Sequence, residues 1–259
     1  MKLKIVKART GIDWVKQGFR TFFKQPIAIS GLFLMFLLTM SLLGSIPLVG
    51  SALALVLLPA ATLGLMAASE EASQGKFPMP KVLIVAFQNG ATKTRSMLIL
   101  GFIYSAVFLL VLAITALVDG GQFAKLYLMG GTINEEMLQD ERFELAALIS
   151  VMLYTPLSML FWHAPALVHW HGISPLKSLF FSVIACFKNF WAFTVFGLGW
   201  AAAFLAISMF IGIVVALLGN PQWMAASIFP AAIWMASIFF ASIYFTYKDC
   251  FETETEPTP

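Results

Sequence analysis

Long uncharged runs alternate with short basic segments along the chain, and the first run shows the pattern most clearly. No charged residue occurs between Lys24 and Glu70, an interval of 45 residues. It is interrupted only by the turn-forming segment Gly-Ser-Ile-Pro-Leu-Val-Gly at 44–50. A helix needs about 20 apolar residues to cross a bilayer. The run therefore predicts two membrane-spanning helices joined by a tight turn.

The segment before this run has the pattern of an amphipathic helix. Apolar residues recur at helical spacing over residues 9–25, while Lys16, Arg20 and Lys24 lie elsewhere around the helix. This pattern predicts a helix that lies in the membrane surface, held by its cations and by aromatic side chains. The aromatic residues expected to contact lipid are Trp14, Phe19, Phe22 and Phe23.

Four further apolar runs predict four more spans. They cover residues 96–118, 145–168, 190–218 and 223–247. The fold class predicted is therefore an all-α polytopic membrane protein with six transmembrane helices. Its single membrane domain would comprise residues 1–247.

Composition and charge support this fold and orient it. Of the 259 residues, 60% are hydrophobic and 11% are charged, whereas a soluble domain carries about 25% charged residues. Six spans put both termini on one side, and 14 of the 16 Lys and Arg residues then lie on that side. Only Lys125 and Arg142 lie on the other side. Because cytoplasmic loops are rich in Lys and Arg, we expect both termini to be cytoplasmic in a bacterial inner membrane.

A recurring spacing predicts an internal repeat. Pro59 is followed by Gly75 after 16 residues, and Pro156 by Gly172 after the same interval. A basic amphipathic stretch follows each pair, which gives three predicted surface helices near 9–25, 80–94 and 175–189, each leading into a hairpin. Gly, Pro and Lys are also ordinary at the ends of membrane helices, so the spacing has a simpler explanation too. The three pseudo-repeats would cover about 9–69, 78–168 and 173–247.

Two segments depart from the repeat. Residues 119–144 form the one long external loop and carry six carboxylates, and the capping-box spacing of Thr132 and Glu135 predicts a helix that runs into the fourth span. Residues 248–259 form a short acidic tail that we expect to be cytoplasmic and disordered.

All three histidines, His163, His169 and His171, fall within nine residues at the end of the fourth span. Imidazole binds zinc, copper and haem iron, so a metal or haem site is conceivable there. The nearest carboxylate, Glu144, and the nearest thiol, Cys186, are 19 and 15 residues away, so no ligand set is completed locally. We favour a role as interfacial anchors for this Trp- and His-rich segment, and we expect no metal and no cofactor.

Catalytic signals are missing from the sequence. None of the six predicted spans carries Asp, Glu, Lys or Arg away from its ends, and no GxSxG, HExxH, Walker or GxGxxG motif occurs. We therefore expect neither an enzyme nor an ion-coupled pump. Pro59, Pro156, Pro165 and Pro230 could break helices around a substrate site, but kinks that serve packing are the favoured interpretation.

The basic stretches have the firmest physical role. Each Lys or Arg near the surface contributes about 1 kcal/mol of attraction to anionic lipid. The expected partners are anionic membrane lipids, with a possible membrane-protein partner at the external loop and no nucleic acid. The predicted lipid-binding residues are Lys16, Arg20, Lys24, Lys81, Lys93, Arg95, Lys177 and Lys188.

The N-terminal motifs resemble those of a known family. Arg9-x-Gly11-x-x-Trp14 with Gly18, Phe22 and Pro26, followed by Ile46-Pro47-x-x-Gly50, is similar to an uncharacterised family of six-helix inner-membrane proteins of proteobacteria. The plan of surface helix plus hairpin is more distantly similar to the membrane domain of bacterial glycerophosphodiester phosphodiesterases. The resemblance covers essentially the whole chain and implies an inner-membrane protein, but it transfers no catalytic residue.

Two functions are compatible with these features. The first is a non-catalytic membrane protein that organises anionic lipid or a partner complex. The second is a transporter or permease for an apolar or amphiphilic solute, which would use a cavity on the axis of the three repeats.

Overall fold

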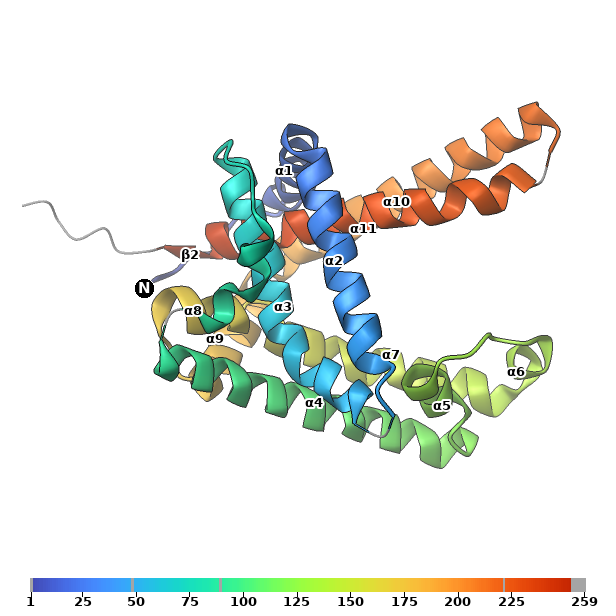
Figure 1. Cartoon of the computed structure of the whole chain (residues 1–259), viewed down its shortest axis with the longest axis horizontal. Helices are drawn as coiled ribbons and strands as arrows, with labels where there is room; N and C mark the ends of the chain where they lie inside the picture. Colours follow the sequence, from blue (N-terminus) through green and yellow to red (C-terminus); the bar gives the residue numbers. More distant parts are fainter. Residues whose placement is uncertain (1, 48, 89, 221, 253–259) are drawn as a thin grey trace, which may run out of the picture. The chain divides into compact units, whose positions relative to one another are not determined.

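The computed structural model describes residues 2–47, 49–88, 90–220 and 222–252, and most of these residues are helical (Figure 1). The N-terminal elements are β1 (Lys2–Leu3), α1 (Thr10–Lys24), α2 (Pro26–Gly44), α3 (Gly50–Ser73) and the 3₁₀ helix η1 (Pro80–Phe87). The central elements are α4 (Ala91–Asp119), α5 (Gln122–Met129), α6 (Glu135–Gln139), α7 (Glu141–Phe161) and α8 (Ala164–His171). The C-terminal elements are α9 (Pro175–Lys188), α10 (Phe190–Leu218), α11 (Gln222–Cys250) and β2 (Phe251–Glu252).

Six helices of the described chain are long and apolar enough to cross a membrane. They are α2, α3, α4, the combined α7 and α8, α10 and α11. The predicted all-α polytopic fold with six transmembrane helices is therefore confirmed. Each span begins and ends within a few residues of its predicted bounds, because the apolar runs themselves are bounded by charges and turn residues.

The chain forms two compact units. Unit 1 contains Met1–Leu38, Ala61–Ala86 and Ile184–Pro259, and unit 2 contains Thr39–Ala60 and Phe87–Val183. The division falls within α2, α3, η1 and α9, so each of these helices contributes to both units. The predicted single domain over residues 1–247 stays a prediction.

Unit 1 is built on the hairpin of α10 and α11, on which α1 packs. An aromatic core joins the three helices. Trp14 of α1 contacts Phe193 and Phe196 of α10, and Phe196 in turn contacts Phe239 of α11. Phe33 of α2 adds to this core through Phe240 of α11, with ring centroids 5.4 Å apart. Aromatic pairs of this kind add about 0.5–1.5 kcal/mol to the burial of their surface.

The two ends of the described chain meet in unit 1. β1 and β2 pair antiparallel, with Leu3 opposite Phe251. The side chain of Asn189, at the start of α10, accepts from Val6 N at 2.8 Å and donates to Lys4 O at 3.1 Å and to Cys250 Sγ at 3.5 Å. The chain beyond Tyr247 therefore continues in α11 and β2 as far as Glu252. The rest of the predicted acidic tail, residues 253–259, lies outside the described residues.

Unit 2 is centred on the antiparallel pair of α4 and α7, and its fourth span is broken between α7 and α8. Ser182 of α9 occupies this break. Its Oγ accepts from His163 N at 3.0 Å and donates to Met159 O at 2.7 Å. The hydroxyl thus replaces the hydrogen bond that a continuous helix would form between these two backbone groups. A side chain inserted in this way is a recognised cause of a helix kink.

The three predicted surface helices differ from one another. Helices α1 and α9 lie where residues 9–25 and 175–189 were expected to be helical. The second, expected over 80–94, is only the 3₁₀ helix η1, distorted at Ile84, and Gly90 with φ 91° separates it from α4. Gly75 and Gly172 both adopt positive φ just after α3 and α8 respectively, as their matched spacing suggests. The threefold repeat itself stays a prediction.

The prediction for the external loop was wrong in detail. The cap lies at Asn134, whose side chain accepts from Met137 N, and α6 is only five residues long. Asp140 then interrupts the helix and caps α7 by accepting from Arg142 N at 2.9 Å. The helix expected to run on from Thr132 and Glu135 is therefore divided, because Asp140 offers its carboxylate to a new helix N-terminus.

Candidate lipid-binding site

Helix α1 packs lengthwise on the hairpin of α10 and α11 through two glycines. A Cβ on Gly11 would lie 2.1 Å from Ala192 O, and one on Gly18 would lie 2.6 Å from Ser242 Cβ. Neither space admits a methyl group without movement. The backbone of α1 therefore approaches both helices closely, and this approach fixes which face of α1 is left outward.

Helices α1 and α11 pack antiparallel, so later residues of α1 contact earlier residues of α11. Trp14 Nε1 donates to Asp249 Oδ2 at 2.8 Å, Gly18 meets Ser242, and Phe22 contacts Trp234. Trp14 is fully buried and Phe22 nearly so. The expectation that these two aromatic residues contact lipid was therefore wrong, because the apolar face of α1 is covered by protein. Phe23, at 70% exposure, remains available to lipid.

The outward face of α1 carries the predicted cations. Lys16, Arg20 and Lys24 are exposed, on the side opposite the buried Trp14 and Gly18. Packing of the inner face thus leaves these three cations on the outer face of α1. The other predicted lipid-binding residues are exposed as well, except for the half-buried Lys93: Lys81, Arg95, Lys177 and Lys188.

Lys24 and Lys93 have protein partners. Lys24 Nζ donates to Ser73 O at 2.8 Å, at the C-terminus of α3. Lys93 Nζ donates to His169 O at 2.9 Å, near the C-terminus of α8. The last carbonyls of a helix lack intrahelical donors, and a lysine ammonium both satisfies them and complements the helix dipole. Lys24 and Lys93 therefore stabilise helix ends, and Lys16 and Arg20 are the better candidates for lipid.

The three histidines do not assemble a metal site. In the ranges that the structure describes, no group of three or more His, Cys, Asp or Glu residues could hold a metal ion. His163 and His169 are buried and His171 is half-buried, at the break and along α8. His169 packs against Trp170 with ring centroids 6.0 Å apart. These positions place two of the imidazoles within the packing of α8 in unit 2.

The cysteines also serve packing. Cys186 and Cys250 are both buried thiols in unit 1. Burial raises the pKa of Cys186 to about 12. Because the thiolate is the reactive form, Cys186 is unsuited to nucleophilic or redox chemistry at neutral pH.

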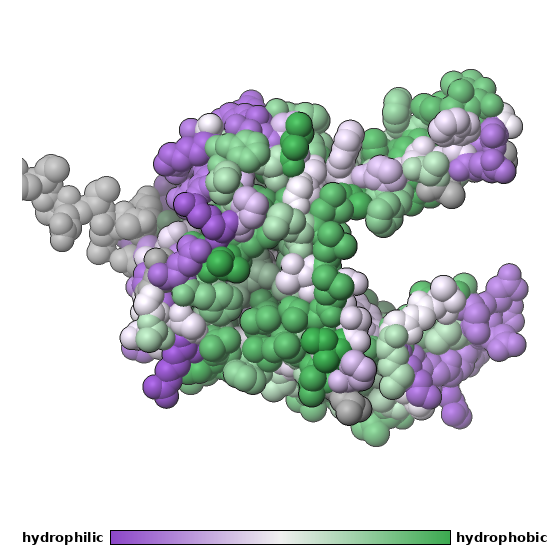
Figure 2. All heavy atoms as spheres, viewed as in Figure 1, coloured by the Kyte–Doolittle hydropathy of each residue, from purple (hydrophilic) through white to green (hydrophobic). Residues whose placement is uncertain are grey.

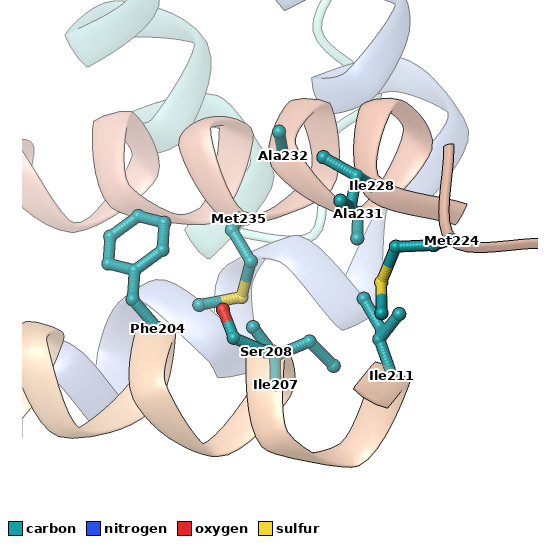
Figure 3. Close-up of a pocket in the computed structure, with 9 residues that line it drawn as sticks. All are labelled: Phe204, Ile207, Ser208, Ile211, Met224, Ile228, Ala231, Ala232 and Met235. Atoms are coloured by element: carbon teal, nitrogen blue, oxygen red, sulfur yellow. The ribbon is translucent and has the colours of Figure 1, made fainter. Parts of the chain in front are cut away.

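An apolar cleft opens between α10 and α11 (Figure 3). Its volume is about 240 Å³. The side chains of Phe204, Ser208 and Ile211 line it from α10, and those of Ile228, Ala231 and Met235 line it from α11. Figure 3 shows these side chains projecting into the space between the two helices. The cleft lies beyond the part of the hairpin that α1 covers.

The external segment is polar in contrast. Figure 2 shows hydrophilic residues gathered over α5, α6 and the start of α7. The buried Asp119 holds the start of α5 by accepting from Gly121 N at 2.8 Å and from Phe123 N at 2.6 Å. The hydrogen bond from Arg142 N, and then that from the Gln122 amide, lower the pKa of Asp140. The remaining carboxylates of this segment are exposed: Glu135, Glu136, Glu141 and Glu144.

The six apolar helices define this chain as a polytopic α-helical membrane protein. It belongs to a family of inner membrane proteins. The chain is 38% identical, over 262 residues, to a probable inner membrane protein of Burkholderia thailandensis, and the match covers 100% of this chain and 97% of the relative. No family model matches the chain, and no solved structure matches it significantly. The distant similarity to the phosphodiesterase membrane domain therefore stays a prediction.

Proposed function

We propose that this inner membrane protein is non-catalytic and organises anionic lipid at the cytoplasmic leaflet. The observation that carries the proposal is the outward face of α1, where Lys16 and Arg20 are exposed while Trp14 and Gly18 anchor the opposite face in protein. A rigid basic face attracts anionic headgroups with about 1 kcal/mol per cation.

The length of α10 supports a position of α1 at the membrane surface. Its 29 residues extend about 43 Å at 1.5 Å per residue, whereas the hydrocarbon core is about 30 Å thick. The contacts of α1 on α10 fall between Ala192 and Trp200, in its first 11 residues. The remaining 18 residues of α10 extend about 27 Å, which is close to the core thickness. In this arrangement α1 would lie at headgroup level.

The orientation is part of the proposal. Both termini are cytoplasmic, because 14 of 16 cations then lie on the cytoplasmic side. Cys186 and Cys250 are buried, so engineered cysteines are the better reporters. In intact spheroplasts, a membrane-impermeant maleimide should label Lys125→Cys, and it should label Lys248→Cys only after lysis. The reverse pattern would exclude this topology.

Ionic strength tests the lipid role. Native mass spectrometry of the purified protein should show retained phosphatidylglycerol or cardiolipin at low salt. High salt should remove most of it, because dissolved ions screen the attraction between the cations and the headgroups. At physiological ionic strength this attraction already falls off over a Debye length of about 8 Å. Retention that does not depend on salt would contradict an electrostatic role.

A second candidate function is a transporter for an apolar or amphiphilic solute. The cleft between α10 and α11 favours it, since its lining is almost entirely apolar. Transport would require uptake of such a solute by proteoliposomes above the level of empty liposomes.

A partner complex assembled at the external segment 119–144 is a further part of the proposal, and affinity purification with and without α5 and α6 tests it.

A further inference from the structure

The cleft between α10 and α11 is a hollow between two membrane-spanning helices. Both helices meet the length and hydropathy of a span. The cleft opens sideways, because Phe204 and Ile228 line it and are themselves 41% and 52% exposed. In the bilayer the cleft would therefore face the hydrocarbon of the lipid, and a ligand would enter it laterally from the membrane.

The chemistry of the lining restricts the occupant. Among the described residues that line the cleft, Ser208 alone has a polar side chain, and no charged residue occurs in the sequence between Lys188 and Lys248. A headgroup or a charged solute would lose its hydration there without a compensating partner. A flexible hydrocarbon chain has no such cost and gains contact with walls that would otherwise face a void.

The cleft is continuous with the α1 interface. Phe19 of α1 stacks on Trp200 of α10 at 5.6 Å, and Trp200 contacts Phe204, a lining residue, at 5.9 Å. On the other helix, Phe22 of α1 contacts Trp234, the neighbour of the lining residue Met235. The side chain of Trp200 thus connects the cleft to Phe19 in the C-terminal half of α1, and Arg20 in the same half is exposed.

We infer that this cleft holds one acyl chain of a membrane phospholipid whose phosphate lies near the basic face of α1. The inference rests on the proposed function for the phosphate, but the site of the acyl chain depends only on the cleft. A single lipid bound in both places would be held more firmly than a lipid that only borders the protein.

The test uses the full-length protein in nanodiscs that contain a phospholipid with a photoreactive acyl chain. Illumination followed by mass spectrometry should locate the label on lining residues such as Ser208 and Ile228. Labelling there should saturate as the probe fraction rises, as expected for a site. Labelling that only increases in proportion to the probe, as on the outer face of α10, would overturn the inference.

Variants sharpen the test. Ala231→Phe fills the cleft and should reduce labelling of the lining about tenfold, the effect of losing about two buried methylenes. Ala202→Phe is the matched control, because Ala202 is exposed on α10 and does not line the cleft. Equal labelling in both variants would overturn the inference. If Ala231→Phe fails to fold, the saturation measurement on the parent protein still decides.

Two results separate this inference from the proposed function. Probes with phosphatidylglycerol and phosphatidylcholine headgroups should both label the cleft, even in a Lys16→Gln, Arg20→Gln variant. If both probes label the cleft of the parent protein but that protein does not prefer the anionic headgroup, the proposed function fails and the acyl-chain site stands. Crosslinks from the lining to a second copy of the chain, with no lipid adduct, would identify another occupant and overturn the inference.

Discussion

Trp14 and Asp249 are 235 positions apart in the sequence and are joined by a 2.8 Å hydrogen bond from the indole Nε1 to the carboxylate Oδ2. The bond ties the helix that carries the basic face to the end of the last span. Together with the pairing of β1 and β2, it closes unit 1 between its two ends. The position of Lys16 and Arg20 depends on this closure, because both follow Trp14 within two helical turns.

Removal of the indole donor should loosen α1. Trp14→Phe leaves Asp249 without this donor, and a hydrogen bond to a charged group contributes about 1.5–3 kcal/mol. We expect the free energy of unfolding to fall by about 2–3 kcal/mol, measured by denaturant titration in a mild detergent. Trp191→Phe is the control, since Trp191 is 71% exposed at the start of α10. Equal losses in the two variants would show that the Trp14 bond contributes nothing.

The close approach of α1 gives a second prediction. Gly11→Ala should destabilise the protein by about 1–3 kcal/mol, because its Cβ would meet the backbone oxygen of Ala192, which cannot rotate away. Gly197→Ala in α10 has open space around its Cβ and should be neutral or stabilising by up to about 1 kcal/mol. Thermal unfolding in detergent compares them. A Gly11 variant as stable as the Gly197 variant would contradict this packing.

The spans were predictable from sequence, and the partner of α1 was not. Charge-free runs bounded by lysines and glycines specify where a helix crosses a membrane. An amphipathic pattern states only that α1 has an apolar face, and lipid or protein can cover such a face equally well. Gly11 and Gly18, seven residues apart on the apolar side of α1, were the available signal, since small residues permit close approach between helices.

Ser182 shows another limit of sequence analysis. The break between α7 and α8 lies near Pro165, which marks a helix boundary, but the hydroxyl that satisfies His163 N and Met159 O comes from 23 residues beyond Met159. No local pattern predicts that pairing. The acceptors of Lys24 and Lys93 are likewise backbone carbonyls, which every residue carries, so the sequence does not distinguish these lysines from Lys16.

Ser182→Ala should therefore destabilise unit 2. Both backbone groups at the break would lose their partner in a buried environment, at a cost of about 1–3 kcal/mol each. The control is Ser178→Ala in the same helix, whose hydroxyl donates to Pro175 O within α9. Hydrogen exchange at His163 should accelerate in the first variant alone. Unchanged protection there would mean that Ser182 does not bridge the break.

The cap at Asp140 predicts a response to pH. Because hydrogen bonds to its carboxylate lower its pKa in the folded protein, the cap contributes fully above the ordinary pKa of about 3.9. That contribution is lost as the pH falls through the lower folded pKa. NMR of ¹³C-labelled aspartate should give a midpoint for Asp140 below the ordinary value, and Asp140→Asn serves to assign the signal. A midpoint at or above the ordinary value would contradict the cap.

The two groups of cations should differ in their effect on lipid. Lys24→Gln with Lys93→Gln should disturb the ends of α3 and α8, because both ammonium groups donate to carbonyls there. Retention of anionic lipid should change little in this variant. A loss of lipid as large as that caused by removing Lys16 and Arg20 would assign all four residues to one basic surface.

The most direct test of the central claim compares two variants that lose the same charge. Lys16→Gln with Arg20→Gln removes the outward cations of α1, and Lys125→Gln with Arg142→Gln removes the two exposed cations of the external segment. Native mass spectrometry measures the phosphatidylglycerol and cardiolipin retained by each in one mild detergent. The first variant should bind them about thirtyfold more weakly than the parent protein, which corresponds to about 2 kcal/mol for two cations, and the second should match the parent. Equal retention by both variants would contradict the claim that α1 organises anionic lipid.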